Sequence, residues 1–391
     1  MENNQLTDHQ LLAHLIGFDT TTKLSPKPLM DFVCDYLEHP DIRITRFDCG
    51  DGYENVWCET GAPSSSGEGV TLCGHVDTVP ALEPDWQTNP WELVIRDGRM
   101  YGRGACDMKG FDAIAINALL RAAREGVAFP FALLLTHSEE TGTIGAGQFA
   151  EQWPAGRVMP SKVLVGEPTS YDAVRAHKGH LTIDLSVCGA PCHTGFPYKG
   201  INAITKAMPL LNALEEFRSV LSEERTPESE LFEDVPYPVF TISRIMGGTA
   251  INIMPERCTL NIGIRMLPGQ SIDAMVERVR KVVVDAGFRI SDEGLPGDCI
   301  FNVVNATPAF GLAKDDPFLS VVLAHARSKA PIGVNYGTDA GRLEVLGCRS
   351  VVFGPGDITQ AHRANEWISC EEFDRASAVV DSIAREAGGM P

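Results

Sequence analysis

The feature that most constrains the fold of this 391-residue chain is an alternation of short apolar runs, bounded by Gly and Pro, with helical patterns. The runs include Val70 to Cys73, Phe131 to Thr136 and Val163 to Val165, and helical patterns cover 110–125 and 144–153. Continuous apolar runs of this length are typical of strands that are buried on both faces of a sheet and joined by crossover helices. The pattern therefore predicts an α/β domain, in which catalytic residues tend to follow the carboxyl ends of strands.

The pattern changes near residue 178 and changes back near residue 297. Between these points the expected order is strand, helix, strand, strand, helix, strand, which is typical of a small α+β sandwich. The periodicity from Asn202 to Leu221 predicts one long helix in this stretch. We therefore expect two domains: residues 1–178 and 298–391 form the first, and residues 179–297 are inserted into it as the second.

Charge and cysteine usage exclude several classes of partner. The chain has 33 Lys and Arg against 52 Asp and Glu, a formal charge of −19, and no basic run, which argues against a nucleic acid or an anionic membrane. No apolar segment reaches the length of about 18 residues that a membrane helix needs. The 11 scattered Cys lack a C-x-x-C pair, and residues 1–22 lack the features of a signal peptide. These observations predict free thiols and a cytoplasmic protein.

The segment Gly74 to Thr78 is the first candidate for a functional site, because it directly follows an apolar run. Side chains alternate along a strand with a period of two, so His75 and Asp77 are expected on the same face. A metal-binding imidazole usually donates its other ring N–H to a carboxylate, and Asp77 is spaced to accept it. The alternative is an ordinary surface pair.

A second candidate is the glycine-dense loop from Gly102 to Gly110, which leads into the next helical pattern. Such a loop brings backbone close to a site and can hold one carboxylate, that of Asp107, rigidly. The alternative is a glycine turn whose Asp caps the following helix. The loop lacks the third glycine of a dinucleotide fingerprint and the Lys-Ser/Thr of a phosphate loop, so a nucleotide site is not expected.

Further polar residues follow other predicted strands. Glu139 and Glu140 end one apolar run and point in opposite directions, so one can bind a metal while the other acts as a base; the alternative is solvated charge. If the strands of one sheet bring their ends together, two imidazoles and three carboxylates converge. This donor set suits two divalent ions, Zn²⁺ first, with Co²⁺ or Mn²⁺ as alternatives. The five predicted ligands, each expected after a strand of that sheet, are His75, Asp107, Glu140, Glu167 and His362.

Three motifs, in this order, resemble the dimetallic aminoacylase/carboxypeptidase/desuccinylase family over nearly the whole chain: G-H-x-D-T at 74–78, G-x-x-D-M-K-G at 104–110 and E-E-x-G at 139–142. The resemblance implies a zinc-exopeptidase-like catalytic domain, with a mixed sheet flanked by helices, and a smaller, inserted, ferredoxin-like dimerisation domain. It also implies that Asp107 bridges two metal ions. His75 and Glu167 would complete one metal site, and Glu140 and His362 the other.

The same resemblance implies roles for further residues. Glu139 is expected to be the general base, and Asp77 is expected to orient His75. His193 resembles a histidine that the family supplies from a neighbouring subunit to stabilise the oxyanion, which implies a homodimer; the alternative is a surface His in a loop. The residues expected to bind the substrate carboxylate, with a turn or a solvated strand end as the alternatives, are Asn252, Arg265 and Thr338.

These expectations predict a metal-dependent amidohydrolase that acts on a small N-acyl amino acid. Segments at 166–170, 174–180, 235–238 and 264–269 resemble the deacetylases of the family, whereas 337–342 is nearer to its desuccinylases. Desuccinylase and dipeptidase or carboxypeptidase activities therefore remain alternatives. From another class, the chain could be a catalytically silent binding protein, but all five ligand positions and Glu139 are intact.

Overall fold

The computed structural model describes residues 5–388 and divides them into two compact units. The first contains the described residues up to Arg175, then Leu312–Ile332, and the described residues from Thr338 onward. The second contains Ala176–Gly311 and Gly333–Gly337. The sequence-based boundary at residue 297 thus lies just before a strand, β13 (Asp298–Thr307), that pairs within the second unit.

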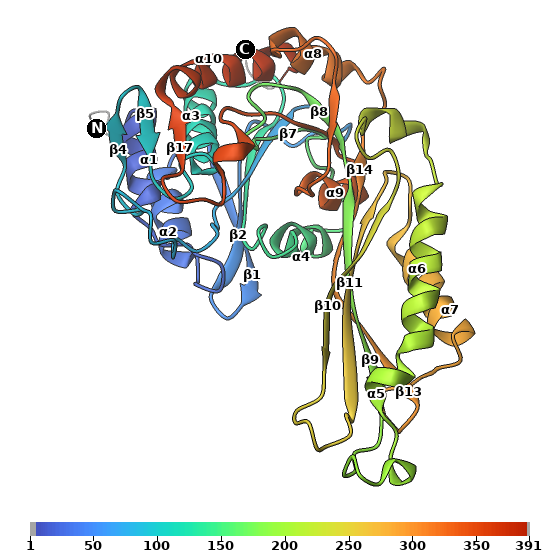
Figure 1. The fold of residues 1–391 in the computed structure, drawn as a ribbon. Coiled ribbons are helices and arrows are strands. Elements are labelled where there is room, and N and C mark those ends of the chain that lie inside the picture. Colours follow the sequence, from blue (N-terminus) through green and yellow to red (C-terminus); the bar gives the residue numbers. More distant parts are fainter. Residues whose placement is uncertain (1–4, 389–391) are drawn as a thin grey trace. The chain divides into compact units, whose positions relative to one another are not determined.

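A mixed sheet forms the centre of the first unit (Figure 1), as the sequence predicts. Four neighbouring strands run parallel, and antiparallel strands flank them on both sides. The order is β1 (Arg43–Gly50), β2 (Tyr53–Thr60), β6 (Phe131–Thr136), β3 (Val70–His75), β7 (Lys162–Val165), β16 (Arg349–Val352), β8 (Val174–His177) and β14 (Phe310–Gly311), with β15 (Ile332–Val334) also paired to β8. Of these strands, β14 and the ends of β8 and β15 fall within the residues of the second unit.

Helices cover this sheet, which is why its central strands are apolar throughout. Every residue of β3 and of β6 is buried. The longest helix, α3 (Lys109–Glu125), packs against β2, β3 and β6 and is buried along most of its length, because other helices pack on its outer side. The helices of this unit are α1 (Asp8–Ile16), α2 (Lys27–Tyr36), α3, α4 (Ile144–Gln152), α8 (Pro317–His325), α9 (Ala340–Leu343) and α10 (Cys370–Glu386), and the short 3₁₀ turns are η3 (Glu344–Leu346) and η4 (Ile358–Gln360).

A separate three-stranded sheet contains the strand that precedes the Asp107 loop. It contains β17 (Trp367–Ser369), β5 (Arg99–Tyr101) and β4 (Val94–Arg96), in that order. The expectation that every candidate ligand follows a strand of one sheet is therefore wrong for Asp107, which follows β5 and precedes α3. Its position comes from a loop between a small sheet and a helix.

The second unit has the strand order of a ferredoxin-like fold. Its sheet runs β10-β11-β9-β13-β12, and two long helices lie against one face (Figure 1). The burial of β11 alternates residue by residue, as expected for a sheet covered on one side. The elements are β9 (Gly179–Cys188), η1 (Pro197–Lys199), α5 (Ala203–Lys206), α6 (Met208–Ser222), η2 (Pro227–Leu231), β10 (Val239–Gly247), β11 (Arg257–Met266), α7 (Ile272–Asp285), β12 (Arg289–Ile290) and β13.

The single helix predicted from Asn202 to Leu221 is wrong in one respect, because it is two helices. The Asn202 side chain caps α5 by accepting N–H groups of Ile204 and Thr205. Pro209 then stands in the first turn of α6, where its missing N–H leaves no intrahelical bond unmade. Among residues 5–388, no helix combines the length and the apolar character that crossing a bilayer requires.

Candidate metal centre

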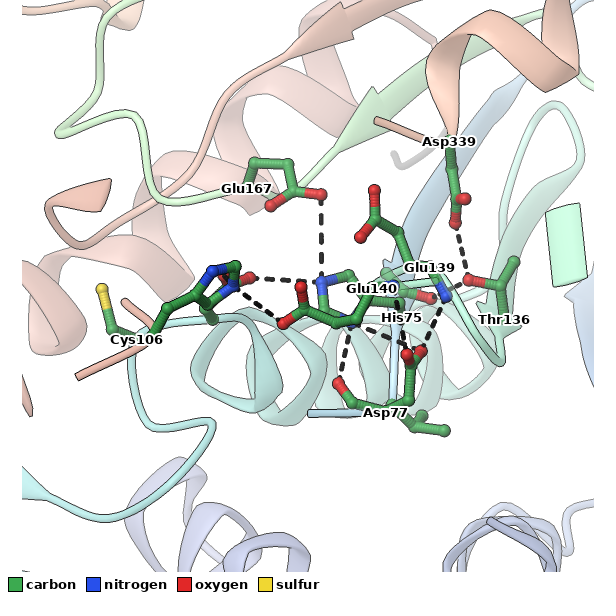
Figure 2. A network of polar contacts seen from close by, with 12 residues as sticks. His75, Asp77, Cys106, Thr136, Glu139, Glu140, Glu167 and Asp339 are labelled. Atoms are coloured by element: carbon green, nitrogen blue, oxygen red, sulfur yellow. Dashed lines mark hydrogen bonds and ion pairs between the residues drawn. The ribbon is translucent and has the colours of Figure 1, made fainter. Parts of the chain in front are cut away.

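Two groups of potential metal ligands meet at the carboxyl ends of the parallel strands (Figure 2). His75, Asp107 and Glu167 form one group; Asp107, Glu140 and His362 form the other. Within each group the donor atoms lie within 4.8 Å of one another. His75 ends β3, and the other strand-derived ligands follow β6, β7 and β16, whose carboxyl ends share an edge of the sheet. The structure therefore brings together all five predicted ligands.

Asp107 stands between the two imidazoles. Its Oδ1 lies 3.2 Å from His75 Nε2, and its Oδ2 lies 3.2 Å from His362 Nε2. His75 Nε2 is also 4.0 Å from Glu167 Oε1, and His362 Nε2 is 3.0 Å from Glu140 Oε1. Because each carboxylate oxygen of Asp107 faces a different group, the arrangement suits a carboxylate that bridges two cations.

The electrostatics of the centre favour positive charge. Burial raises the pKa of Glu167 and of Glu140, and repulsion from Asp107 adds to both shifts. Burial opposes protonation of His75, but hydrogen bonding to Asp107 and the charge of Glu167 raise its pKa well above the ordinary value. Hydrogen bonds to Asp107 and Glu140 raise the pKa of His362 to about 10. Divalent cations would relieve this crowding of carboxylates, so the residues present fit a dinuclear metal site.

Asp77 has a different contact from the one expected. The His75 Nδ1–H donates to the backbone carbonyl of Asp77 at 3.0 Å, whereas the nearest carboxylate oxygen is 3.7 Å away. This bond leaves Nε2 of a neutral His75 as an acceptor that faces the centre. The Asp77 carboxylate instead accepts the backbone N–H groups of Glu139, at 2.9 Å, and Glu140, at 3.2 Å. Asp77 thus orients His75 through its main chain and fixes the Glu139–Glu140 turn through its side chain.

Glu139 lies in a tightly held turn after β6. The N–H groups of Gly142 and Thr143 donate to its backbone carbonyl at 2.9 and 2.8 Å, and Arg342 Nε donates to Thr143 Oγ1 at 2.9 Å. Figure 2 shows its half-buried side chain reaching into the space between Glu167 and Asp339. Burial raises the pKa of Glu139 well above its ordinary value; the charge of His75 opposes this shift, and repulsion from neighbouring carboxylates adds to it.

The candidate residues of the second unit lie at two ends of its sheet. His193 forms a β-bridge with Ile253, and the N–H of Thr194 donates to the Asn252 carbonyl at 3.1 Å, so His193 and Asn252 are neighbours in one exposed region. Arg265 pairs with His180 near the other end of β11. Cys258 lies at the end of β11 that follows Asn252, and at about 3.3 Å per residue it is roughly 23 Å along the strand from Arg265. The structure brings the first two together and holds Arg265 apart.

Thr338 lies in the first unit and is fully buried. Its Oγ1 accepts the N–H of Ala340 at 3.2 Å, at the start of α9. This contact is structural, and the role of Thr338 toward substrate stays a prediction.

Sequence reasoning missed several buried polar residues near the centre. Asp339 accepts the Thr136 hydroxyl at 2.6 Å, and burial raises its pKa to about 6. Arg103 and Glu366 form a buried ion pair at 2.8 Å beside the Asp107 loop. Arg103 lies inside the glycine-dense loop, and Glu366 lies four residues after His362. Only this closeness in sequence to two predicted ligands, Asp107 and His362, could have indicated a role for them.

Comparisons with known proteins agree with this geometry. Residues 71–386 match the family described as Peptidase family M20/M25/M40. Acetylornithine deacetylase of Myxococcus xanthus is 32% identical over 394 residues, which covers 97% of this chain and 97% of that protein. Acetylornithine deacetylase of Proteus mirabilis (strain HI4320) is 33% identical over 367 residues, covering 92% and 90%.

Solved structures share the fold at low sequence identity. A metallo-carboxypeptidase of the M20 family from Sulfolobus solfataricus has a TM-score of 0.76 at 16% identity, covering 98% of this chain and 100% of that one. A dinuclear metal-binding peptidase of the M20 family from Bacillus subtilis has a TM-score of 0.65 at 16% identity, covering 98% and 99%. With the match over most of the chain and the two facing ligand groups, the protein belongs to peptidase family M20/M25/M40.

Proposed function

We propose that this metal-dependent amidohydrolase removes the acetyl group from N2-acetyl-L-ornithine and releases L-ornithine and acetate. The observation that carries the proposal is the pair of ligand groups that share Asp107, in a chain whose relatives over most of its length are named acetylornithine deacetylase. With this substrate the reaction belongs to arginine biosynthesis. The 11 free cysteines fit a reducing compartment, and we expect the enzyme in the cytoplasm.

We expect two Zn²⁺ ions, with Co²⁺ or Mn²⁺ as alternatives, because the donors are imidazoles and carboxylates without a thiolate. His75 and Glu167 would hold one ion and Glu140 and His362 the other, with Asp107 shared. When bound, such a pair of ions polarises an amide carbonyl and makes a water molecule more acidic.

The protein's own residues would carry the proton. Glu139 would accept a proton from the attacking water and deliver it to the departing amine; in support, it lies beside the ligands without belonging to either group. Asp77 supports this role by holding the backbone N–H of Glu139. No covalent acyl intermediate is needed.

The second unit would complete the site in a homodimer. A small substrate cannot span the roughly 23 Å between the Arg265 and the His193 ends of one sheet, at about 3.3 Å per residue of β11. If both ends contact one substrate molecule, they come from different chains. Arg265 would then bind the substrate carboxylate as a bidentate fork, and Thr338 would be a further substrate-binding residue. His193 and Asn252 would reach the site of the partner subunit.

A substrate panel tests this function. Purified protein loaded with Zn²⁺ or Co²⁺ is assayed with acetylornithine, succinyl-diaminopimelate and dipeptides, and its metal content is measured. We expect about two ions per chain and the highest kcat/KM with acetylornithine. If the protein binds two ions but prefers the succinyl substrate or dipeptides, the assignment as an amidohydrolase stands and the proposed substrate is wrong. No metal uptake would favour a binding protein.

A further inference from the structure

We propose that the buried ion pair of Arg103 and Glu366 positions the second ligand group, by holding the backbone of Asp107 and the segment of His362 at a fixed separation. The inference rests on the proposed dinuclear centre. Both side chains are 1% exposed, so the pair is part of the interior of the first unit. Neither side chain belongs to a ligand group. Glu366 contacts the main chain of the ligand Asp107, and Arg103 contacts the main chain of Arg363, which follows the ligand His362.

Glu366 holds the Asp107 loop. One carboxylate oxygen, Oε1, accepts the backbone N–H of Cys106 at 2.9 Å and that of Asp107 at 3.0 Å. Hydrogen bonds to an ionised carboxylate are shorter and stronger than those between neutral groups. Two consecutive N–H groups on one oxygen fix the direction of the peptide that carries Asp107, and with it the direction of the Asp107 side chain.

Arg103 connects Glu366 to the segment after His362 and to one further loop, at Pro80 and Glu83. Its Nη1 donates to Glu366 Oε2 at 2.8 Å and to the carbonyl of Arg363, the residue after His362, at 3.3 Å. Its Nη2 donates to the carbonyl of Pro80 at 3.0 Å and to Glu83 at 3.1 Å. A planar guanidinium presents its donors in a rigid fork, so one side chain sets the spacing of all these groups.

His362 depends on such support more than His75 does. His75 ends a fully buried strand, whereas the His362 side chain is 51% exposed and its backbone has φ of 59°, in the left-handed region that a non-glycine residue rarely adopts. Strained backbone persists where surrounding contacts determine it. The segment after His362 is held by Arg103 and, at Asn365, by a bond from its side chain to the carbonyl of Asp85 at 2.9 Å.

The test is a Co²⁺ titration of metal-free protein, read by the visible absorption of bound Co²⁺ and by calorimetry. In Glu366→Gln we expect the affinity for one ion to fall 10- to 100-fold, the range typical of partners that orient ligands. The affinity for the other ion should fall clearly less, because of its ligands only the shared Asp107 depends on Glu366, whereas His75 ends β3 and Glu167 follows β7. Arg103→Lys, which keeps the charge and loses the fork, should show a smaller loss of the same ion.

The matched control is Asp381→Asn, which breaks the ion pair of Arg121 and Asp381 between α3 and α10, about three helical turns after the start of α3 at Lys109. It should bind both ions as the wild type does. The proposal is overturned if Glu366→Gln binds both ions with unchanged affinity, or if it loses both equally. If Glu366→Gln does not fold, Arg103→Lys decides by the same criteria. A wild-type protein that takes up no second ion would overturn the dinuclear site itself.

Discussion

At the scale of single residues, Glu139 separates chemistry from metal binding. It lies beside the two ligand groups and belongs to neither. We expect Glu139→Gln to lower kcat by about 10² to 10⁴, the usual effect of losing a general base. Metal analysis should still find the wild-type content. The control is Glu151→Gln, an exposed carboxylate on α4, which should keep full activity. Turnover retained in Glu139→Gln would exclude the residue as the base.

Asp112 makes stability depend on pH in a direction opposite to that of a salt-bridged carboxylate. It is 1% exposed, and neither carboxylate oxygen has a hydrogen-bond partner among the described residues. Burial raises the pKa of Asp112 well above its ordinary value. The folded protein therefore retains a proton that the unfolded chain releases, and stability falls as pH rises above the unfolded pKa.

Asp112→Asn should remove this contribution. Between pH 5 and 8, the free energy of unfolding of the wild type should fall relative to that of the variant by up to about 1.4 kcal/mol per pH unit. Urea unfolding of the two metal-free proteins in chelator, at a series of pH values, measures the difference. Curves that stay parallel across this range would mean that Asp112 is ionised in the folded protein.

The sequence predicted residues that end apolar strands better than residues that act through the main chain. His75, Glu140 and Glu167 stand where a buried run gives way to a polar side chain, and parallel strand ends meet at one edge. Glu366 binds backbone N–H groups some 260 positions away, and main-chain donors carry no sequence signature. The contact of Asp77 differed from expectation for the same reason.

At the scale of elements, Gly166 shows how closely α3 packs on the sheet. A Cβ at Gly166, after β7, would lie 2.0 Å from the ring of Phe111 on α3. Gly166→Ala should therefore displace the end of β7, which precedes Glu167. We expect a loss of about 1–3 kcal/mol of stability, typical of overpacking, together with weaker metal binding.

The matched control for this prediction is Gly147→Ala in α4. There the nearest atom to the new Cβ, in the Arg342 side chain, is at an ordinary 3.5 Å. Replacing a helix-interior glycine by alanine should raise stability by up to about 1 kcal/mol. Denaturant midpoints of both variants check the opposite signs. A neutral Gly166→Ala would mean that Phe111 moves aside easily.

Element types followed from periodicity, and their exact extents did not. The strands at Phe131–Thr136 and Val163–Val165 were predicted because both faces are apolar. The break between α5 and α6 was missed because the apolar period continues across it, and only the geometry of Pro209 separates the two helices. The small sheet with β5 was missed because strands of three residues have no measurable period.

At the scale of the whole molecule, His193 allows a test of the proposed dimer. Glu139→Gln and His193→Ala homodimers are each expected to be nearly inactive while retaining their metal content. If His193 serves the partner's site, a mixed dimer has one site with both residues intact. Mixing the two variants under conditions of subunit exchange should then restore activity.

The outcome separates the two arrangements. In a mixed dimer whose His193 serves its own chain, each site lacks one of the two residues, so activity stays at the level of the parents. The matched control is a mixture of each variant with itself. Size-exclusion chromatography with light scattering establishes whether a dimer forms.

The order of the ligands along the chain has a consequence during synthesis. The donors of the first ligand group are complete once a nascent polypeptide has reached Glu167, whereas the second group waits for His362, which the ribosome adds only after the entire ferredoxin-like insertion. Three carboxylates and one imidazole of the centre thus leave the exit tunnel before the last ligand, His362, does. A released fragment that ends between Glu167 and His362 carries every donor for one cation and an incomplete set for the other.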